Sequence, residues 1–206
     1  SVREFEEDKF VMVATERGIV KKTSLMAYSK PRQGGIIGLT IDKGDRVIGA
    51  ELCDGESDIL LATEKGFSIR FSEKEVRPIG RTGRGVRGIR LKKEDRVVGA
   101  EIVQPGNKFL TVTSKGYGKR TRMEEYPVQG RGGLGVMTIR CNEKTGTVVG
   151  VQQVEETDQL LVITSNGNIV RMRVNEISVI GRNTQGVRLV GIGEGNQVVS
   201  IEKLVE

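Results

Sequence analysis

Thr15-Glu16-Arg17-Gly18 is the first of four Thr-x-x-Gly stretches, and the spacing of these stretches predicts the fold. The other three are Thr63-Glu64-Lys65-Gly66, Thr113-Ser114-Lys115-Gly116 and Thr164-Ser165-Asn166-Gly167, so successive glycines lie 48, 50 and 51 residues apart. A short apolar run precedes each stretch, and a half-apolar run follows it with a basic residue four places beyond the glycine. Because a tight hairpin turn favours a residue that tolerates positive φ, each stretch predicts a strand, a turn and a strand.

The remainder of each repeat also recurs at the same spacing. A polar, glycine-rich loop is followed by an alternating run, a polar turn and a last apolar run. The glycines that end the loops, Gly35, Gly85, Gly135 and Gly186, are spaced by 50, 50 and 51 residues. Alternation between short polar turns is typical of strands, so we expect strands at 36–41, 86–91, 136–140 and 187–190. The repeats run approximately over residues 9–56, 57–105, 106–155 and 156–206.

A period of about 50 residues with about four strands per period is typical of radial, propeller-like folds. The run Leu160–Ile163 is apolar at consecutive positions, as expected for a strand that neighbouring blades cover on both faces. No segment has a convincing helical period. The sequence therefore predicts one all-β domain over residues 1–206, with four blades of about four strands and no significant helix. The start at Ser1 and the cuts at repeat boundaries indicate a fragment of a longer protein.

The composition narrows the possible functions. A net charge of +6 and a sequence pI of about 9.4 favour a polyanionic partner such as nucleic acid. With no His, two Cys and no carboxylate pair at a fixed place in the repeat, we find no catalytic set and no metal site. Residues 83–88 fit G-x-G-x-x-G, but they lead into a strand rather than a helix, which argues against a dinucleotide site. No apolar run approaches the 18 residues of a membrane span.

The basic residues gather at two phases of the repeat, just after the hairpin turn and in the glycine-rich loop with its following strand. In a radial array, residues that recur at one phase lie on one ring, so their charges would form a continuous band. Arginine beside glycine suits phosphate, because the guanidinium and the backbone N–H groups can both donate. The alternative is a solvated face of scattered charge. The candidate residues after the turn are Lys21, Lys22, Arg70, Lys119, Arg120 and Arg171, and those of the loops are Lys30, Arg32, Arg81, Arg84, Arg87, Arg131, Arg182 and Arg188.

Residues 116–121 (Gly-Tyr-Gly-Lys-Arg-Thr), 82–91 (Thr-Gly-Arg-Gly-Val-Arg-Gly-Ile-Arg-Leu) and 176–187 (Glu-Ile-Ser-Val-Ile-Gly-Arg-Asn-Thr-Gln-Gly-Val) resemble the C-terminal, DNA-wrapping domain of bacterial DNA gyrase A. The resemblance covers essentially the whole chain. It implies a β-pinwheel, which is a propeller-like disc whose blades exchange strands with their neighbours. The corresponding C-terminal domain of topoisomerase IV is the nearer alternative. A propeller scaffold that binds an acidic protein partner is the other.

The resemblance also implies a function and a setting. Duplex DNA would wrap around the outer edge of the disc without sequence readout, in support of ATP-dependent negative supercoiling by the whole enzyme. This chain would then be non-catalytic and hold no cofactor, because ATP and Mg belong to other parts of the enzyme. Its partners would be duplex DNA, the rest of gyrase A and gyrase B, with no membrane involved. We expect a monomeric fragment in the bacterial cytoplasm, associated with the nucleoid.

One departure from the family concerns its signature box, Gln-Arg-Arg-Gly-Gly-Lys-Gly, which belongs to the first of about six blades. The nearest stretch here is residues 129–135, in the same loop phase, and it lacks one Arg and the Lys. Two explanations are open: the true box lies upstream of this chain, or this loop is a partial substitute. The departure bears on DNA wrapping by this chain alone rather than on DNA binding. The residues retained in the partial box are Gln129, Arg131, Gly132, Gly133 and Gly135.

Overall fold

The computed structural model describes residues 2–204, and within that range it contains fifteen β-strands and four short 3-10 helices. No α-helix occurs among these residues, and none of their helical segments has the length and apolar character needed to cross a membrane. The prediction of an all-β chain without significant helix is therefore confirmed. The 3-10 helices are η1 (Leu25–Tyr28), η2 (Glu73–Glu75), η3 (Met123–Glu125) and η4 (Val174–Glu176).

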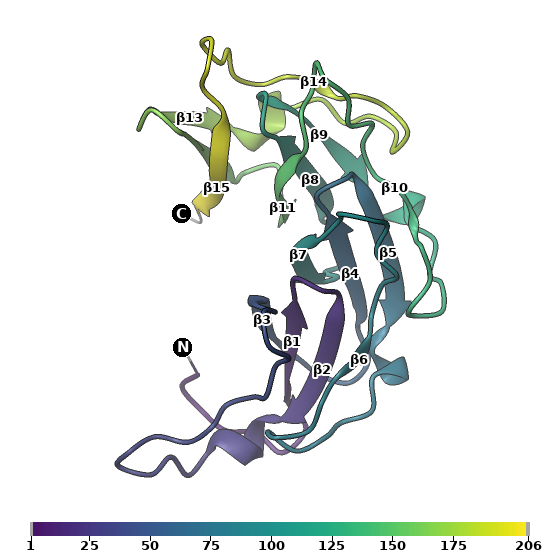
Figure 1. Ribbon diagram of the computed structural model, residues 1–206, viewed down its shortest axis with the longest axis vertical. Helices are drawn as coiled ribbons and strands as arrows, with labels where there is room; N and C mark the ends of the chain where they lie inside the picture. The colour runs from purple at the N-terminus through teal and green to yellow at the C-terminus, as the bar shows by residue number, and fades with distance from the viewer. Residues whose placement is uncertain (1, 205–206) are drawn as a thin grey trace.

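The strands form four antiparallel sheets that follow one another along an arc (Figure 1). The last strand of each repeat lies on the inside of the arc, where β3, β7, β11 and β15 contact one another in sequence. The first and last described parts of the chain lie on this inner side. From the inside outward, the sheets are β3 (Val47–Cys53), β1 (Phe10–Thr15), β2 (Ile19–Ser24) and β6 (Val86–Arg87); β7 (Val97–Ile102), β4 (Asp58–Thr63), β5 (Phe67–Ser72) and β10 (Val136–Met137); β11 (Val148–Val154), β8 (Lys108–Thr113), β9 (Tyr117–Arg122) and β14 (Val187–Arg188); and β15 (Val198–Leu204), β12 (Gln159–Thr164) and β13 (Ile169–Arg173).

The outermost strand of each four-stranded sheet comes from the next repeat. β6 belongs to the second repeat but pairs with β2 of the first, with Val86 opposite Val20. In the same way β10 pairs with β5 and β14 pairs with β9. The second, third and fourth repeats thus each donate a strand to the blade before them, which is the exchange that defines a β-pinwheel.

The Thr-x-x-Gly turns have the geometry that the sequence predicts. All four glycines have positive φ, between +77° and +82°. Each glycine N–H donates to the threonine carbonyl three residues earlier at 2.9–3.0 Å, which closes a tight turn. A side chain at Gly66 or Gly116 would also collide with the segment that follows the donated strand, at the carbonyls of Ile139 and Val190. The glycine therefore serves both the turn and the strand exchange.

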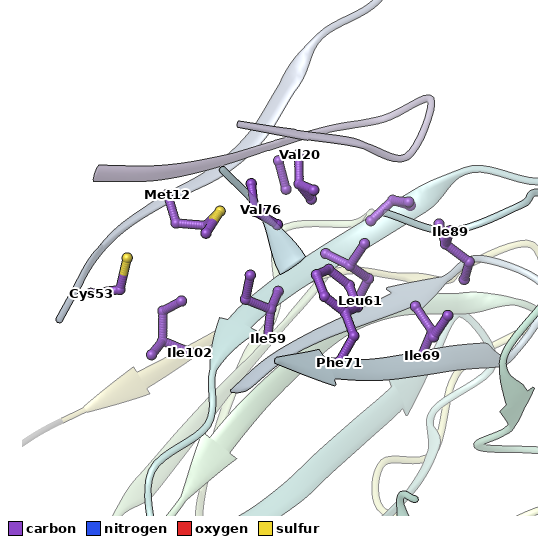
Figure 2. Close-up of a cluster of buried hydrophobic side chains, with 12 residues drawn as sticks. Met12, Val20, Cys53, Ile59, Leu61, Ile69, Phe71, Val76, Ile89 and Ile102 are labelled. Carbon is purple, nitrogen blue, oxygen red and sulfur yellow. The ribbon is translucent and has the colours of Figure 1, made fainter. Parts of the chain in front are cut away.

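The core consists of three apolar clusters, and each lies between two consecutive blades. Alternate residues of β4 enter different clusters: Ile59 and Leu61 pack toward the first blade with Met12 and Val20 (Figure 2), whereas Leu60 and Ala62 pack toward the third. This division explains why the first strand of a repeat is apolar at consecutive positions, since both of its faces are buried.

Three details differ from the sequence prediction. Residues 36–41 form no strand, and no described strand lies beside them. The donated strands are two residues long, because the chain turns away after its second pair and runs along the turn of the neighbouring blade. The fourth sheet has three strands within the described residues, since no later repeat there donates a strand to β13.

Candidate nucleic-acid interface

The outer edge of the arc is built from the donated strands and the glycine-rich loops that precede them. Each loop leaves its own blade, crosses to the preceding one and enters its sheet as β6, β10 or β14. The second residue of each donated strand is therefore an outermost position of the fold. Arg87 and Arg188 occupy this position in β6 and β14, and both are exposed.

Six of the predicted DNA-binding residues are exposed. Arg84 is 81% exposed, and its only described charge partner is Asp42, at 3.6 Å across the surface. Arg188 donates from Nη2 to the hydroxyl of Tyr117 at 3.4 Å, a contact that leaves its remaining N–H groups at the surface. Further exposed arginines of the same loops and strand ends are Arg77, Arg90, Arg122, Arg140 and Arg173. The six exposed members of the predicted set are Lys30, Arg32, Arg84, Arg87, Arg171 and Arg188.

Four of the predicted residues are buried, and this requires a correction. The Lys22 Nζ donates to the Glu73 carbonyl at 2.9 Å, and Arg120 Nε donates to the Ile177 carbonyl at 2.8 Å. Both side chains are 4–5% exposed, too little to meet a DNA backbone. The prediction placed them on the rim by phase alone, but the chain of the next repeat covers this phase. We leave Lys22 and Arg120 out of the interface.

Lys21 and Lys119 lie under the loops rather than on them. The Lys119 Nζ donates to the carbonyls of Gly181 and Arg182 at 2.5 Å each. Lys21 Nζ likewise donates to the Arg81 carbonyl. Burial lowers the pKa of Lys119 to about 8, against a smaller opposing effect of Glu125. These two lysines donate hydrogen bonds to the loops from their buried side, so we also remove them from the predicted interface.

The remaining predicted arginines are half-buried and already hydrogen-bonded. Arg70 Nε pairs with Asp58 at 2.8 Å, and its Nη1 donates to the Met123 carbonyl at 3.1 Å. The guanidinium groups of Arg81, Arg131 and Arg182 also donate to backbone carbonyls. Their nitrogen donors are therefore partly committed within the protein.

The partial box is a structural part of the second blade. The Gln129 N–H donates to the Arg70 carbonyl at 2.8 Å, and the Gly132 N–H donates to the Gly88 carbonyl at 2.6 Å. Gly135 has φ +71°, and a side chain there would collide with the Ser68 carbonyl of the strand that receives β10. Gly133 packs on Ile69. These glycines allow the loop to lie flat on its host strand.

Two carboxylates hold the loops, and the sequence prediction missed them. The Arg131 N–H donates to Glu75 Oε2 at 3.0 Å, and the Arg182 N–H donates to Glu125 Oε2 at 3.1 Å. Glu75 and Glu125 are 50 residues apart, at one phase of the repeat. That periodicity was the signal by which the sequence could have indicated them.

No group of three or more potential metal ligands occurs within residues 2–204.

The sequence profile of one protein family, described as "DNA gyrase C-terminal domain, beta-propeller", matches residues 9–54, 57–104, 107–155 and 158–204. The chain belongs to this family. The four matched segments of the gyrase C-terminal domain family correspond to the four repeats, one segment for each blade.

Individual relatives agree with this membership. The chain is 46% identical over 205 residues to the DNA gyrase A protein of Salmonella typhimurium and 56% identical to that of Buchnera aphidicola. It spans about a quarter of the length of these relatives, 23% and 25% respectively. Among solved structures, it is similar to the C-terminal domain of DNA topoisomerase IV, with a TM-score of 0.92 and 25% identity over 98% of this chain and 64% of that one. A DNA gyrase A C-terminal domain shares the fold, with a TM-score of 0.87 and 24% identity over 99% of this chain and 68% of that one.

Proposed function

We propose that this chain binds duplex DNA through its phosphate backbone along the outer edge of the arc, without reading the base sequence. The observation that carries the proposal is the position of Arg87 and Arg188, exposed on the outermost strands of two blades. Arg84 and Arg90 are exposed near Arg87 in the second repeat, and Arg140 is exposed in the third repeat, between those of Arg87 and Arg188. Contacts of guanidinium groups to phosphate fix the position of a duplex but carry no base information.

The arc also suits a bent duplex. Bending a 20–30 base-pair site costs roughly 1–6 kcal/mol, and several phosphate contacts along a convex edge would offset that cost. The exposed arginines Arg87, Arg140 and Arg188 of successive repeats supply such contacts along the edge, although the outermost residue of β10 is Met137.

We place this activity within a bacterial gyrase. The relatives are gyrase A proteins, and the chain corresponds to about a quarter of each. In this proposal the chain is an accessory, DNA-wrapping part of an ATP-dependent topoisomerase in the bacterial cytoplasm. DNA cleavage and the ATP and Mg chemistry belong to the rest of gyrase A and to gyrase B, and this chain needs no cofactor of its own.

A salt titration of DNA binding tests the proposal. For each phosphate neutralised, log K should fall with log salt by a slope of about 0.9. If about five phosphates are engaged, affinity should fall by roughly two to three orders of magnitude between 50 and 200 mM salt. The double variant Arg87→Gln with Arg188→Gln should lower the slope by about 1.8, and equally on unrelated DNA sequences.

The matched control removes the same charge from the inner side of the blades. Arg46 and Arg96 precede inner strands β3 and β7 and form surface ion pairs with Glu16 at 3.1 and 3.2 Å. The variant Arg46→Gln with Arg96→Gln should keep the wild-type slope to within about half a unit, because neither residue lies on the proposed path. Equal slopes for the two double variants would refute the rim as the binding site. If the chain binds an acidic protein and linear duplex DNA does not displace that protein, the scaffold function would be supported instead.

A further inference from the structure

Three arginines connect consecutive loops along the rim. Arg81, Arg131 and Arg182 are 50 and 51 residues apart, each four residues before its loop-ending glycine. Their Nη1 atoms donate to the carbonyls of residues in the preceding loop, Ile37 at 2.6 Å, Arg87 at 3.1 Å and Met137 at 2.8 Å. The acceptors are also in phase, at residues 37, 87 and 137. One contact is therefore repeated at each of three loop-to-loop junctions.

Backbone hydrogen bonds accompany these contacts at the second and third of the three junctions. Between the second and third loops, the Gly132 N–H donates to the Gly88 carbonyl at 2.6 Å, and the Arg90 N–H donates to the Gly133 carbonyl at 2.7 Å. Between the third and fourth loops, the Arg140 N–H donates to the Thr184 carbonyl at 2.9 Å. The loops thus form a connected belt, and the arginine side chains are part of its connections.

The guanidinium of Arg131 joins two different segments. Its Nε donates to the Glu75 carbonyl in η2 at 2.9 Å, while its Nη1 donates to the Arg87 carbonyl in β6 at 3.1 Å. A planar guanidinium can satisfy two acceptors in fixed directions, whereas a lysine ammonium acts as a point charge on a flexible stem. The acceptor is the backbone of Arg87, one of the two residues on which the proposed interface chiefly rests.

We propose that Arg81, Arg131 and Arg182 are positioning residues, which set the spacing of neighbouring rim loops and so aim the exposed arginines at the DNA, and do not themselves contact phosphate. The inference rests on the proposed DNA-binding function. It divides the arginines of the loops into two groups with different roles. Arg81, Arg131 and Arg182 fix the belt, and exposed residues such as Arg87 contact the duplex.

The experiment compares Lys and Gln variants at a positioning residue and at a contact residue. Arg131→Lys keeps the charge but cannot maintain both hydrogen bonds, and Arg131→Gln removes the charge as well. Arg87→Lys and Arg87→Gln are the matched controls, because Arg87 is exposed in the adjoining loop. Three quantities are measured: amide hydrogen exchange at Arg90 and Gly132 without DNA, the salt slope of binding, and DNA bending from fluorescence transfer between the labelled ends of a linear duplex.

Both Arg131 variants should raise exchange at Arg90 and Gly132 by about five- to tenfold, the change expected for loss of one hydrogen bond. Both should reduce DNA bending, and Arg131→Lys should keep the wild-type salt slope. At Arg87, the Lys variant should resemble the wild type, and the Gln variant should lower the slope by about 0.9 without changing exchange.

One result would overturn the inference. In it, Arg131→Lys has the same amide exchange and the same DNA bending as the wild type, and Arg131→Gln lowers the salt slope of binding by about 0.9. Arg131 would then be a phosphate contact. Because exchange is measured without DNA, it decides the positioning role even if the chain fails to bind DNA, an outcome that would refute the proposed function separately. Arg182→Lys and Arg182→Gln repeat the test at the next junction, should an Arg131 variant fold poorly.

Discussion

Glu51 lies on inner strand β3, and its carboxylate reaches the next blade. Its Oε2 accepts a hydrogen bond from the Ile102 N–H at 3.0 Å. One repeat later, Glu101 Oε2 accepts from the Gln153 side-chain amide at 3.1 Å. Burial raises the pKa of Glu51 to about 7; the charge of Glu101 adds to the rise, and the Ile102 hydrogen bond and Lys203 oppose it. Carboxylates on the inner strands therefore connect the blades, and the burial of Glu51 lowers the stability of the fold only at pH values at which this carboxylate is ionised.

We expect Glu51→Gln to stabilise the protein at pH 8 but not near pH 4. The folded chain holds the Glu51 proton more tightly than the unfolded chain, so wild-type stability falls as the pH rises from about 4.5 to about 7. Glutamine keeps an acceptor for the Ile102 N–H without the charge, so the gain at pH 8 should be about 1–3 kcal/mol. Urea unfolding at the two pH values measures it. Glu94→Gln, at a side chain that is 77% exposed, is the control, and a gain for Glu51→Gln that does not change with pH would contradict the explanation.

Single residues also mark the limit of sequence-based prediction. The periodic placement of basic residues predicted a band of charge, and Arg84, Arg87 and Arg188 of that set are exposed on the loops and donated strands. It could not predict that Lys22 and Lys119 are buried, because the segments that cover them come from the next repeat, 51 to 65 residues away along the chain. The position of a residue within its repeat predicts which residues of other repeats occupy equivalent places. It does not predict whether a loop from the next repeat covers that residue.

At the scale of the element, the donated strand joins one blade to the next. It contributes two backbone pairs to its host sheet, and then its chain donates to the host turn, as when the Thr138 N–H donates to the Gly66 carbonyl at 2.8 Å. Alternation in residues 86–91 and 136–140 predicted strands, but alternation is a local signal and does not identify the partner strand. The prediction that blades exchange strands therefore came from the family resemblance, and the observed pairing of β10 with β5 and of β6 with β2 confirms it.

The variants Gly135→Ala and Gly35→Ala separate two requirements at a loop-ending glycine, which are a positive φ and close packing against the host strand. Both glycines have positive φ, +71° and +80°, so both variants suffer the same backbone strain. Only at Gly135 would the added methyl group collide with a host strand, at the Ser68 carbonyl, since nothing lies within 4 Å of that position at Gly35. We expect Gly135→Ala to lose about 1–3 kcal/mol more stability than Gly35→Ala in urea unfolding. Equal losses would mean that the donated strand is not closely packed on its host.

At the scale of the molecule, the four blades form an open arc in the described residues (Figure 1). Val47 is 42% exposed at the start of β3, whereas Val97, Val148 and Val198 at the same phase are each 1% exposed, because a preceding blade covers them. β13 likewise has no donated strand on its outer side within residues 2–204. Repeats in the sequence give the number and order of blades. They do not reveal whether the array closes, which depends on small rotations between blades that no single repeat encodes.

The central claim is that duplex DNA follows the convex rim of this arc, and a topology measurement tests it most directly. Relaxed circular DNA is incubated with the chain and a relaxing topoisomerase, the protein is removed, and the linking number is compared with that of DNA alone. We predict a shift that grows with bound protein, survives in the Arg46→Gln, Arg96→Gln variant and is lost in the Arg87→Gln, Arg188→Gln variant. A linking number that stays unchanged when the DNA is saturated with protein would contradict the account.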